Sequence, residues 1–362
     1  MSAFELEQIS DPDQSVRGQC SIVIDRDDVP HVAYTLTSGM AAIASRIDDA
    51  WQTEELGTGP LVTPQDEERV LLQIASDGRP HVAIIEQGTR ELIHGVRGND
   101  SKWTFTRVPT NLFFLEPGGV AHVAFALHPG NITPAFRDTP QFLFQDQFSD
   151  SLGYARVVDN QMRLTKGLAS TDLGDAGNSE AANAVSMAFD EGSNSIRFTC
   201  VETFPSQIPA KLRVGRINDV TSDELFPGVR SFNLSTRFVS ATSLITRGSE
   251  TWIALGDLAA QSLTSVTLNS DGNLDFEAVS PVTGRVVPSL ASAATVGSLE
   301  PQVAFVNAGK LMFAQRIRLE GWNVEVVDNA RGVAALAFDR QGGGHIAYTN
   351  DTQLRYVRVT GE

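Results

Sequence analysis

Cysteine is scarce in this 362-residue chain, which holds only Cys20 and Cys200, 180 residues apart in strand-like apolar segments. We therefore expect two buried free thiols rather than a disulfide framework. No run of about 18 apolar residues occurs, which argues against a membrane-spanning helix. The acidic N-terminal segment MSAFELEQISDPDQ has no apolar core of the length that a signal peptide needs. A cytoplasmic protein is expected, and secretion stays open if a signal peptide has been removed.

Basic residues are also few. Lys and Arg together number 28 against 44 Asp and Glu, so the formal net charge is −16. Binding to nucleic acid or to anionic lipid needs clustered Lys and Arg, because phosphate groups must be neutralised. The sequence therefore predicts neither a nucleic-acid partner nor a membrane partner. A hydrophobic content of 41% with 20% charged residues is that of an ordinary folded protein.

Motifs that fix a reaction or a cofactor are missing. The sequence has no nucleophile elbow, P-loop, dinucleotide fingerprint or H-E-x-x-H zinc motif. The acidic run at 25–28 lacks the spacing of a helix-flanked calcium loop, so turn carboxylates are favoured over a calcium site. No arrangement of Ser, His and Asp can be asserted from spacing alone. We predict no cofactor and no metal, and leave open whether the chain is an enzyme.

One phrase recurs along the chain: an apolar strand, a turn with Asp or Gly, and a short strand reading His-Val-Ala-aromatic. Seven copies in 362 residues give about 52 residues each, the length of a four-stranded blade with its loops. The copies, the last three of them weaker, lie at 21–35, 71–86, 112–127, 335–349, 187–199, 243–255 and 294–306. Aligned on the second strand, they place in one column His31, His81, His122, Ser195, Trp252, Gln302 and His345.

This period predicts an all-β chain that forms a single seven-bladed β-propeller domain over 1–362. The last copy stops without an outer strand, whereas FELEQIS at 4–10 resembles the outer strands of other copies. We expect this N-terminal strand to complete the last blade and cover its edge. The long third interval is assigned to an insertion at 128–180, whose role stays open. Blades are expected near 17–57, 66–109, 110–170, 181–237, 238–280, 286–328 and 331–362 plus 4–10.

The repeated histidines admit two interpretations. Several imidazoles at one point would bind zinc or iron. Equivalent positions on different blades stand apart around the propeller axis, however, and do not converge. We therefore expect each histidine to hold the turn that precedes it.

The segment TRGSETW at 246–252 resembles a degenerate Asp-box, in which Thr251 and Trp252 match the pattern and Ile245, Arg247 and Ser249 depart from it. With the repeat, this gives the chain a resemblance to the broad bacterial family of seven-bladed propellers with sialidase-like or lectin-like repeats. The box is structural in that family, so the resemblance implies a blade turn and transfers no catalytic residue.

Arginines stand at the entrances of the expected innermost strands. Arg17 and Arg331 each lie fourteen residues before the histidine of their copy, in Arg-Gly pairs of the same register. Arg69 stands within two residues of that level, and Asn111 and Asn183 enter the next two blades at a comparable place. We predict that these five residues bind a ligand, because clustered guanidinium groups suit a carboxylate or a phosphate.

The alternative is that the arginines bond to carboxylates of neighbouring blades, such as Glu67 or Glu68. The resulting functional hypothesis is a recognition propeller whose channel face binds a small polar, anionic or sugar-like ligand, or a protein. A hydrolase, lyase or cyclase with one active site in the central funnel is the other candidate. Trp51, Trp103 and Trp322 recur in only three outer strands, which argues against one lectin site per blade.

Overall fold

The structure is a computed structural model in which seven antiparallel sheets of four strands each account for the regular structure of the described residues. No α-helix occurs in that part of the chain. This is the all-β, seven-bladed propeller fold that the repeat predicts. The described residues are 3–10, 14–57, 70–110, 119–130, 136–146, 152–158, 161–168, 180–190, 195–203, 210–217, 229–234, 239–247, 250–291 and 300–360.

The chain divides into two compact units, which we describe separately. The first contains residues 1–88, 93–106 and 279–362, and the second contains 89–92 and 107–278. Sheets are numbered as blades in chain order, and the last one is blade 7, in which the N-terminal strand takes part.

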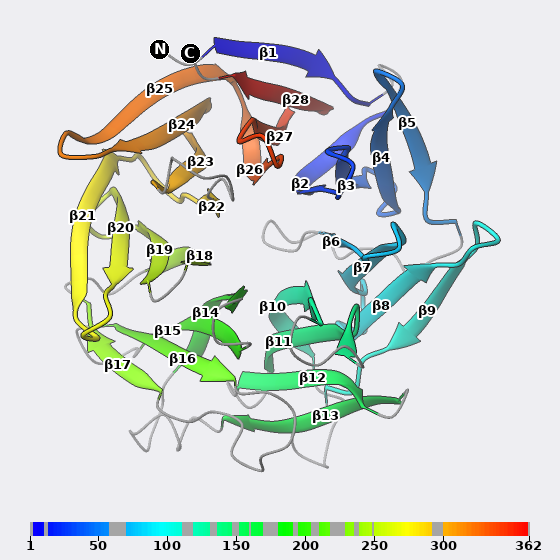
Figure 1. Ribbon diagram of the computed structural model, residues 1–362, viewed down its shortest axis with the longest axis horizontal. Helices are drawn as coiled ribbons and strands as arrows, with labels where there is room; N and C mark the ends of the chain where they lie inside the picture. Colours follow the sequence, from blue (N-terminus) through cyan, green and yellow to red (C-terminus); the bar gives the residue numbers. More distant parts are fainter. Residues whose placement is uncertain are drawn as a thin grey trace. The chain divides into compact units, whose positions relative to one another are not determined.

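Four blades belong wholly or mainly to the first unit. Figure 1 labels their strands. Blade 1 consists of β2 (Val16–Ile24), β3 (Pro30–Leu36), β4 (Ala41–Ile47) and β5 (Ala50–Glu55). Blade 2 consists of β6 (Leu71–Ile74), β7 (Pro80–Ile85), β8 (Leu92–Arg97) and β9 (Trp103–Arg107). Blade 6 consists of β22 (Ser289–Ala291), β23 (Gln302–Asn307), β24 (Lys310–Ile317) and β25 (Gly321–Asn329). Blade 7 consists of β26 (Arg331–Phe338), β27 (Gly344–Asn350), β28 (Gln353–Thr360) and β1 (Ala3–Gln8).

Three blades belong wholly or mainly to the second unit. Blade 3 consists of β10 (Val120–Leu127), β11 (Pro140–Asp146), β12 (Leu152–Val158) and β13 (Gln161–Leu168). Blade 4 consists of β14 (Glu180–Asp190), β15 (Ser195–Thr203), β16 (Lys211–Ile217) and β17 (Arg230–Asn233). Blade 5 consists of β18 (Val239–Arg247), β19 (Glu250–Asp257), β20 (Ser262–Leu268) and β21 (Leu274–Pro281).

The core lies between the faces of neighbouring blades. Second strands such as β3 and β27 are buried along almost their whole length, whereas the outer strands β1 and β5 are mostly exposed. Val32 and Tyr34 of blade 1 pack with Ala347 and Tyr356 of blade 7, while Ala33 faces the other way into the cluster shared with blade 2. Successive residues of a strand point to opposite faces, so one strand contributes to two inter-blade cores.

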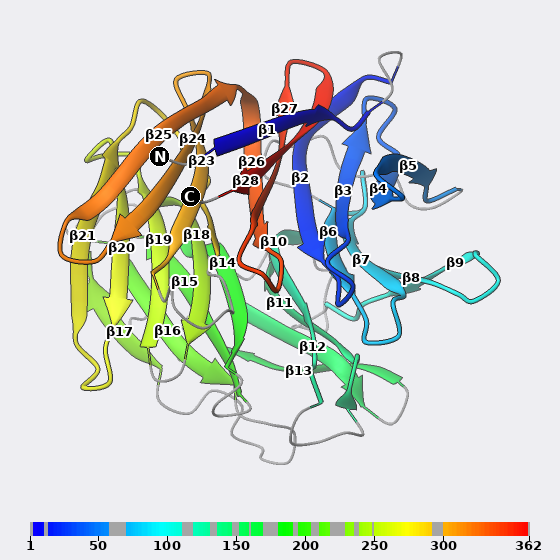
Figure 2. The same cartoon turned by 45° about the horizontal axis from the view of Figure 1, so that its top comes forward.

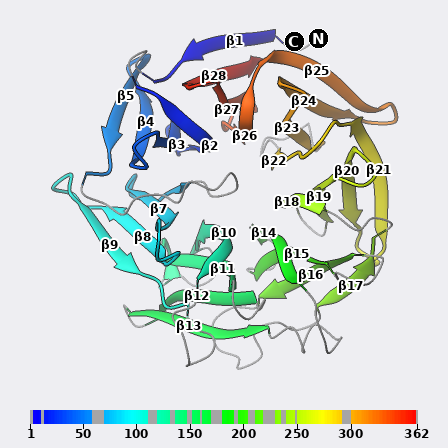
Figure 3. The same cartoon turned by 180° about the vertical axis from the view of Figure 1, so that it is seen from behind.

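The N-terminal strand completes blade 7, as the sequence predicts. β1 runs antiparallel to β28, from Ala3 opposite Thr360 to Gln8 opposite Arg355. Figure 3 shows β1 along the outer side of β28. Beyond the strand, the Ile9 N–H donates to the Leu354 carbonyl at 2.9 Å. The pairing satisfies the backbone of an edge that would otherwise be open to other chains.

At two blade junctions in the first unit, a carboxylate on the outer strand of one blade binds side chains of the next blade. Glu7 of β1 accepts two hydrogen bonds from the Arg46 guanidinium, at 3.1 and 3.2 Å, and one from the Trp51 indole at 2.9 Å. Glu54 of β5 accepts in the same way from Arg97 and Trp103. Two of the three recurrent outer-strand tryptophans therefore bind the preceding blade.

Blade 3 departs from the predicted alignment. His122, expected on a second strand, lies on the first strand β10 opposite Gln145. The second strand is β11, so much of the segment 128–180 forms the regular strands β11 to β13 and the start of β14 rather than an insertion. The alternating segment HVAFAL mimics the second strands of other copies, and this likeness shifted the alignment by one strand.

Deleting residues 1–10 should destabilise the protein, because it removes the β1–β28 ladder and the Glu7 carboxylate together. We expect aggregation, or a fall in Tm of at least about 5 °C, measured by differential scanning fluorimetry. The control is Glu5→Gln, which alters one exposed side chain of β1 and keeps the strand. A truncated protein that melts within a degree or two of the full chain would show that β1 contributes little.

Candidate functional site

The first strands of blades 7 and 1 lie side by side at the site that the sequence analysis singled out (Figure 2). The Val16 N–H at the start of β2 donates to the Thr352 carbonyl at 2.7 Å. Further along, the Cys20 thiol lies 3.8 Å from the Val333 carbonyl of β26. These contacts bring the first residues of β2 and β26 to the same end of two adjacent strands.

Both strands carry a bulge directly after their arginine. Arg17 is opposite Thr35, and the next paired residue of β2 is Cys20, opposite Tyr34, so β2 contains two extra residues. In β26, Arg331 is opposite Thr349 and regular pairing resumes only at Ala335, opposite Ala347, again with two extra residues. Gly332 takes a φ of 84°, a value that glycine adopts without strain. Bulges of this kind redirect side chains and are frequent beside binding sites.

The two guanidinium groups are exposed. The Arg331 side chain is 78% exposed, and its Nε lies 3.0 Å from a carboxylate oxygen of Asp351, in the turn between β27 and β28. Arg17 is exposed at the start of β2. In the bulge of β2, Gln19 is only 5% exposed, and its amide nitrogen has no hydrogen-bond partner among the described residues. A buried amide donor without a partner is costly to stability, and here it stands two residues from Arg17.

The other predicted ligand residues are not brought to this place by the described structure. Arg69 and Asn111 lie outside the described residues, as do Glu67 and Glu68. Asn183 lies on β14 opposite Val201, and its side chain is outside the description. The Asp-box resemblance is not confirmed, because residues 248–249 lie outside the described part of the chain.

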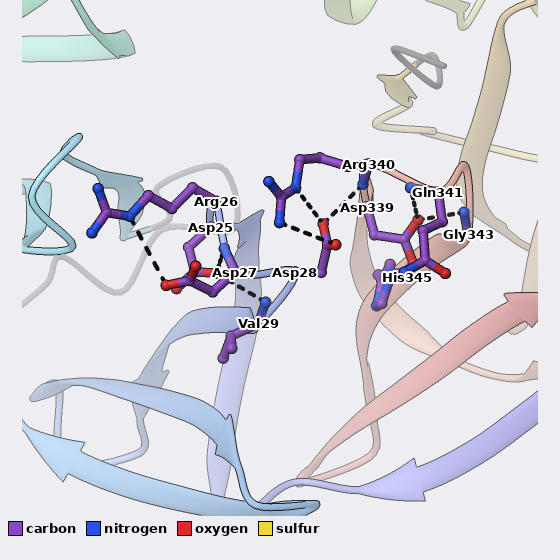
Figure 4. A network of polar contacts seen from close by, with 10 residues as sticks. All are labelled: Asp25, Arg26, Asp27, Asp28, Val29, Asp339, Arg340, Gln341, Gly343 and His345. Carbon is purple, nitrogen blue, oxygen red and sulfur yellow. Dashed lines mark hydrogen bonds and ion pairs between the residues drawn. The ribbon is translucent and has the colours of Figure 1, made fainter. Parts of the chain in front are cut away.

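At their other ends, β2 and β26 enter turns of one design (Figure 4). The Asp25 carboxylate accepts the N–H groups of Asp27 and Val29 at 2.8 and 2.9 Å. The Asp339 carboxylate accepts those of Gln341 and Gly343 at 2.9 and 2.7 Å. Each carboxylate thereby fixes its own hairpin.

The residue after each of these aspartates reaches the next blade. Arg340 binds the Asp28 carboxylate through its backbone N–H at 2.9 Å and through its Nε at 3.2 Å. Arg26, at the equivalent place in blade 1, donates to the Ser76 carbonyl of blade 2 at 2.8 Å. The hydrogen bond from the Arg340 backbone is the main cause that holds the pKa of Asp28 below its usual value. Turns of three successive blades are thus linked in a row.

Two repeated histidines hold their turns, as predicted. His31 and His345 each place Nε2 at 3.1 Å from an Oδ2 atom, that of Asp25 and of Asp339 respectively. His81 differs, because its Nδ1 lies 3.1 Å from Nε2 of the buried His94. Within the described residues, no group of three or more His, Cys, Asp or Glu side chains has the arrangement of a metal site. Both cysteines are buried and form no disulfide, as the sequence predicts.

The sequence matches no protein-family model and no curated protein. The structure is similar to the fucose-specific lectin from Aleuria aurantia, with 13% identity, a TM-score of 0.54, and coverage of 87% of this chain and 97% of that one. It is also similar to AofleA from Arthrobotrys oligospora, with 8% identity, a TM-score of 0.55 and 91% coverage of both chains. A third similar structure is BBS1N in complex with ARL6DN, with 9% identity, a TM-score of 0.58, and coverage of 96% and 93%. At these identities the likeness establishes the propeller fold. In the described part of the chain, no helix has the length and hydropathy that a bilayer crossing demands.

The buried pair His81–His94 should make the protein sensitive to acid. Burial, helped by the nearby His81, lowers the pKa of His94 from 6.5 to about 3. At acidic pH the unfolded chain therefore binds a proton at this histidine that the folded chain does not bind. The contribution of the neutral histidine to stability is fully present above about pH 6.5 and is lost as the pH falls toward 3. Between pH 7 and pH 5 this histidine should lower the free energy of unfolding by about 2 kcal/mol, measured by urea titration. His94→Gln should show a correspondingly flatter pH dependence, and an unchanged slope would contradict the assignment.

Proposed function

We propose that this protein is a recognition propeller that binds a small polar ligand, anionic or sugar-like, at the entrances of β2 and β26. The observation that carries the proposal is the pair of exposed arginines on adjacent bulged strands, together with the buried Gln19 amide in the bulge of β2. Guanidinium groups bind carboxylates and phosphates through paired hydrogen bonds, and an amide supplies a further donor. Arg69, Asn111 and Asn183, which the sequence also predicts as ligand residues, stay predictions, because their side chains lie outside the description.

The positive charge at the entrances of β2 and β26 contrasts with the negative net charge of the protein. Against a net charge of −16, an anion approaches the protein unfavourably at long range. Two exposed guanidinium groups on neighbouring strands offset this repulsion locally. The exposed pair between Arg331 and Asp351 is of a kind that contributes at most about 1 kcal/mol. A ligand carboxylate can therefore replace the Asp351 carboxylate at small cost.

The structural neighbours are consistent with binding of a sugar. One is described as a fucose-specific lectin, and another structure of the Aleuria aurantia lectin holds α-methyl-L-fucoside. A neutral sugar would use its hydroxyl groups as acceptors for the same guanidinium and amide donors. The described arginine pair occurs once, at the junction of blades 7 and 1, which favours one ligand site there over a site repeated in every blade.

Substituting Arg331→Lys should weaken ligand binding about tenfold while the fold survives, because lysine keeps the charge and loses the planar fork. Isothermal titration calorimetry should compare phosphate, sulfate, acetate, a uronic acid and fucose. Asp351→Asn should strengthen binding of the anions, since it removes the competing carboxylate. The matched control is Arg318→Lys, an exposed arginine in the turn between β24 and β25. Equal binding by wild type and Arg331→Lys, or no binding of any of these compounds to wild type, would refute the proposal.

A further inference from the structure

Blade 1 contains a Ser–His–Asp hydrogen-bonded series that spacing alone does not reveal. The Oγ of Ser45 on β4 lies 2.7 Å from Nδ1 of His31 on β3. The Nε2 of the same ring lies 3.1 Å from Oδ2 of Asp25, at the end of β2. A hydroxyl within hydrogen-bond reach of a base, with the base oriented by a third group, is the arrangement of an activated nucleophile.

The direction of each proton follows from the partners. Burial acts to raise the pKa of Asp25, but the hydrogen bonds from the Val29 N–H and from the His31 ring outweigh it and hold that pKa below its usual value. Asp25 is therefore an acceptor, and Nε2 of His31 carries the hydrogen. In the neutral ring Nδ1 is then the acceptor, and it takes its hydrogen bond from the Ser45 hydroxyl. This is the tautomer in which Nδ1 can act as a general base toward the Ser45 hydroxyl.

The Asp25–His31 pair has a counterpart in blade 7, the Asp339–His345 pair. There the Nδ1 of His345 lies 2.5 Å from the hydroxyl of Tyr356, as the Nδ1 of His31 lies beside that of Ser45. In that blade the pair is closed from solvent, with side chains 5% and 4% exposed, whereas the side chains of His31 and Asp25 are each 15% exposed. The blade 1 copy thus differs from the blade 7 copy in two ways: its hydroxyl is the aliphatic one of a serine, which can act as a nucleophile, and its histidine and aspartate are partly exposed.

A hydrogen-bond donor stands next to the serine. The register of blade 1 places His31 opposite Ser45 and Ser45 opposite Gln52 on β5. Side chains directly opposite on adjacent strands share a face and lie about 5 Å apart. Gln52 is exposed, and a side-chain amide of this kind can stabilise the negative oxygen of a tetrahedral intermediate. The four strands of blade 1 therefore present, in order, a carboxylate, a base, a nucleophile and an amide donor.

We propose that Ser45 is a nucleophile activated by His31 and Asp25, and that it hydrolyses small, accessible carboxylic esters. Ser45 Oγ attacks the carbonyl carbon while its proton passes to His31 Nδ1. The intermediate then expels the alkoxide, which takes that proton and leaves as the alcohol, so that the acyl group remains on Ser45. A water molecule next attacks the acyl carbon and gives its proton to Nδ1. The proton returns to Ser45 Oγ as the carboxylic acid is released.

The test is labelling of the full-length protein with a fluorophosphonate probe, followed by peptide mass spectrometry, and hydrolysis of p-nitrophenyl acetate. Wild type should become labelled at Ser45. His31→Gln should slow labelling at least about 100-fold. Asp25→Asn should slow it as well, although asparagine can hold such a turn, as Asn269 does between β20 and β21 by accepting the Asp271 and Asn273 N–H groups.

Two controls separate chemistry from folding. Ser38→Ala, in the exposed turn between β3 and β4, should label and hydrolyse as wild type does. Ser45→Ala should lose labelling and ester hydrolysis while keeping its Tm and its anion or sugar binding at the β2–β26 entrances. Wild type that stays unlabelled at Ser45 at pH 8, or labelling at Ser45 that is equally fast in His31→Gln, would overturn the proposal. Neither result would affect the ligand site proposed above.

Discussion

Apolar side chains on both faces of the second strand are the constraint on which the rest of this structure depends. In β3, Val32 and Tyr34 point to one face while Ala33 points to the other, and all three are fully buried. A four-stranded sheet of this kind cannot bury both faces within itself. Each blade is therefore stable only between neighbours, and the inter-blade clusters of both units are the result. Burial of this area is the main favourable contribution to folding.

Carboxylates give this packing its geometry. Asp25 and Asp339 fix the inner hairpins, Asp28 joins two hairpins, and Glu7 and Glu54 bind an arginine and a tryptophan of the following blade. These groups accept charge-assisted or backbone hydrogen bonds, which set orientation more than they add stability. Part of the excess negative charge of the chain thus serves to hold turns and to join neighbouring blades.

The fold was largely predictable because the same sequence pattern recurs in several copies. A weak or misaligned copy therefore does not change the predicted fold. The missing outer strand of the last copy and the FELEQIS segment together predicted the β1–β28 pairing. The error at His122 arose where one first strand has the same alternation as a second strand, and periodicity cannot separate the two. The lack of a disulfide between the two cysteines and the turn-holding role of His31 and His345 also followed from the residues.

The candidate sites were harder to predict from the sequence than the fold. The shared register of Arg17 and Arg331 was visible in sequence, whereas their bulges and the buried Gln19 amide depend on strand pairing. Ser45 carries no motif at all. It meets His31 only because β3 and β4 pair in a register that the hairpin between them sets. His31 in turn meets Asp25 because the turn between β2 and β3 brings the carboxylate to its ring. Chemistry assembled across strands is invisible until the register is known.

The pairing of β1 with β28 also imposes an order of events during synthesis. β1 leaves the ribosome long before its partner β28, and the contact between Ala3 and Thr360 spans 357 positions of the chain. Contacts so distant in sequence form late, since the cost of closing the loop precedes any gain. β1 therefore stays unpaired until β28 has been made, and its acidic residues keep it from pairing with other strands during that time.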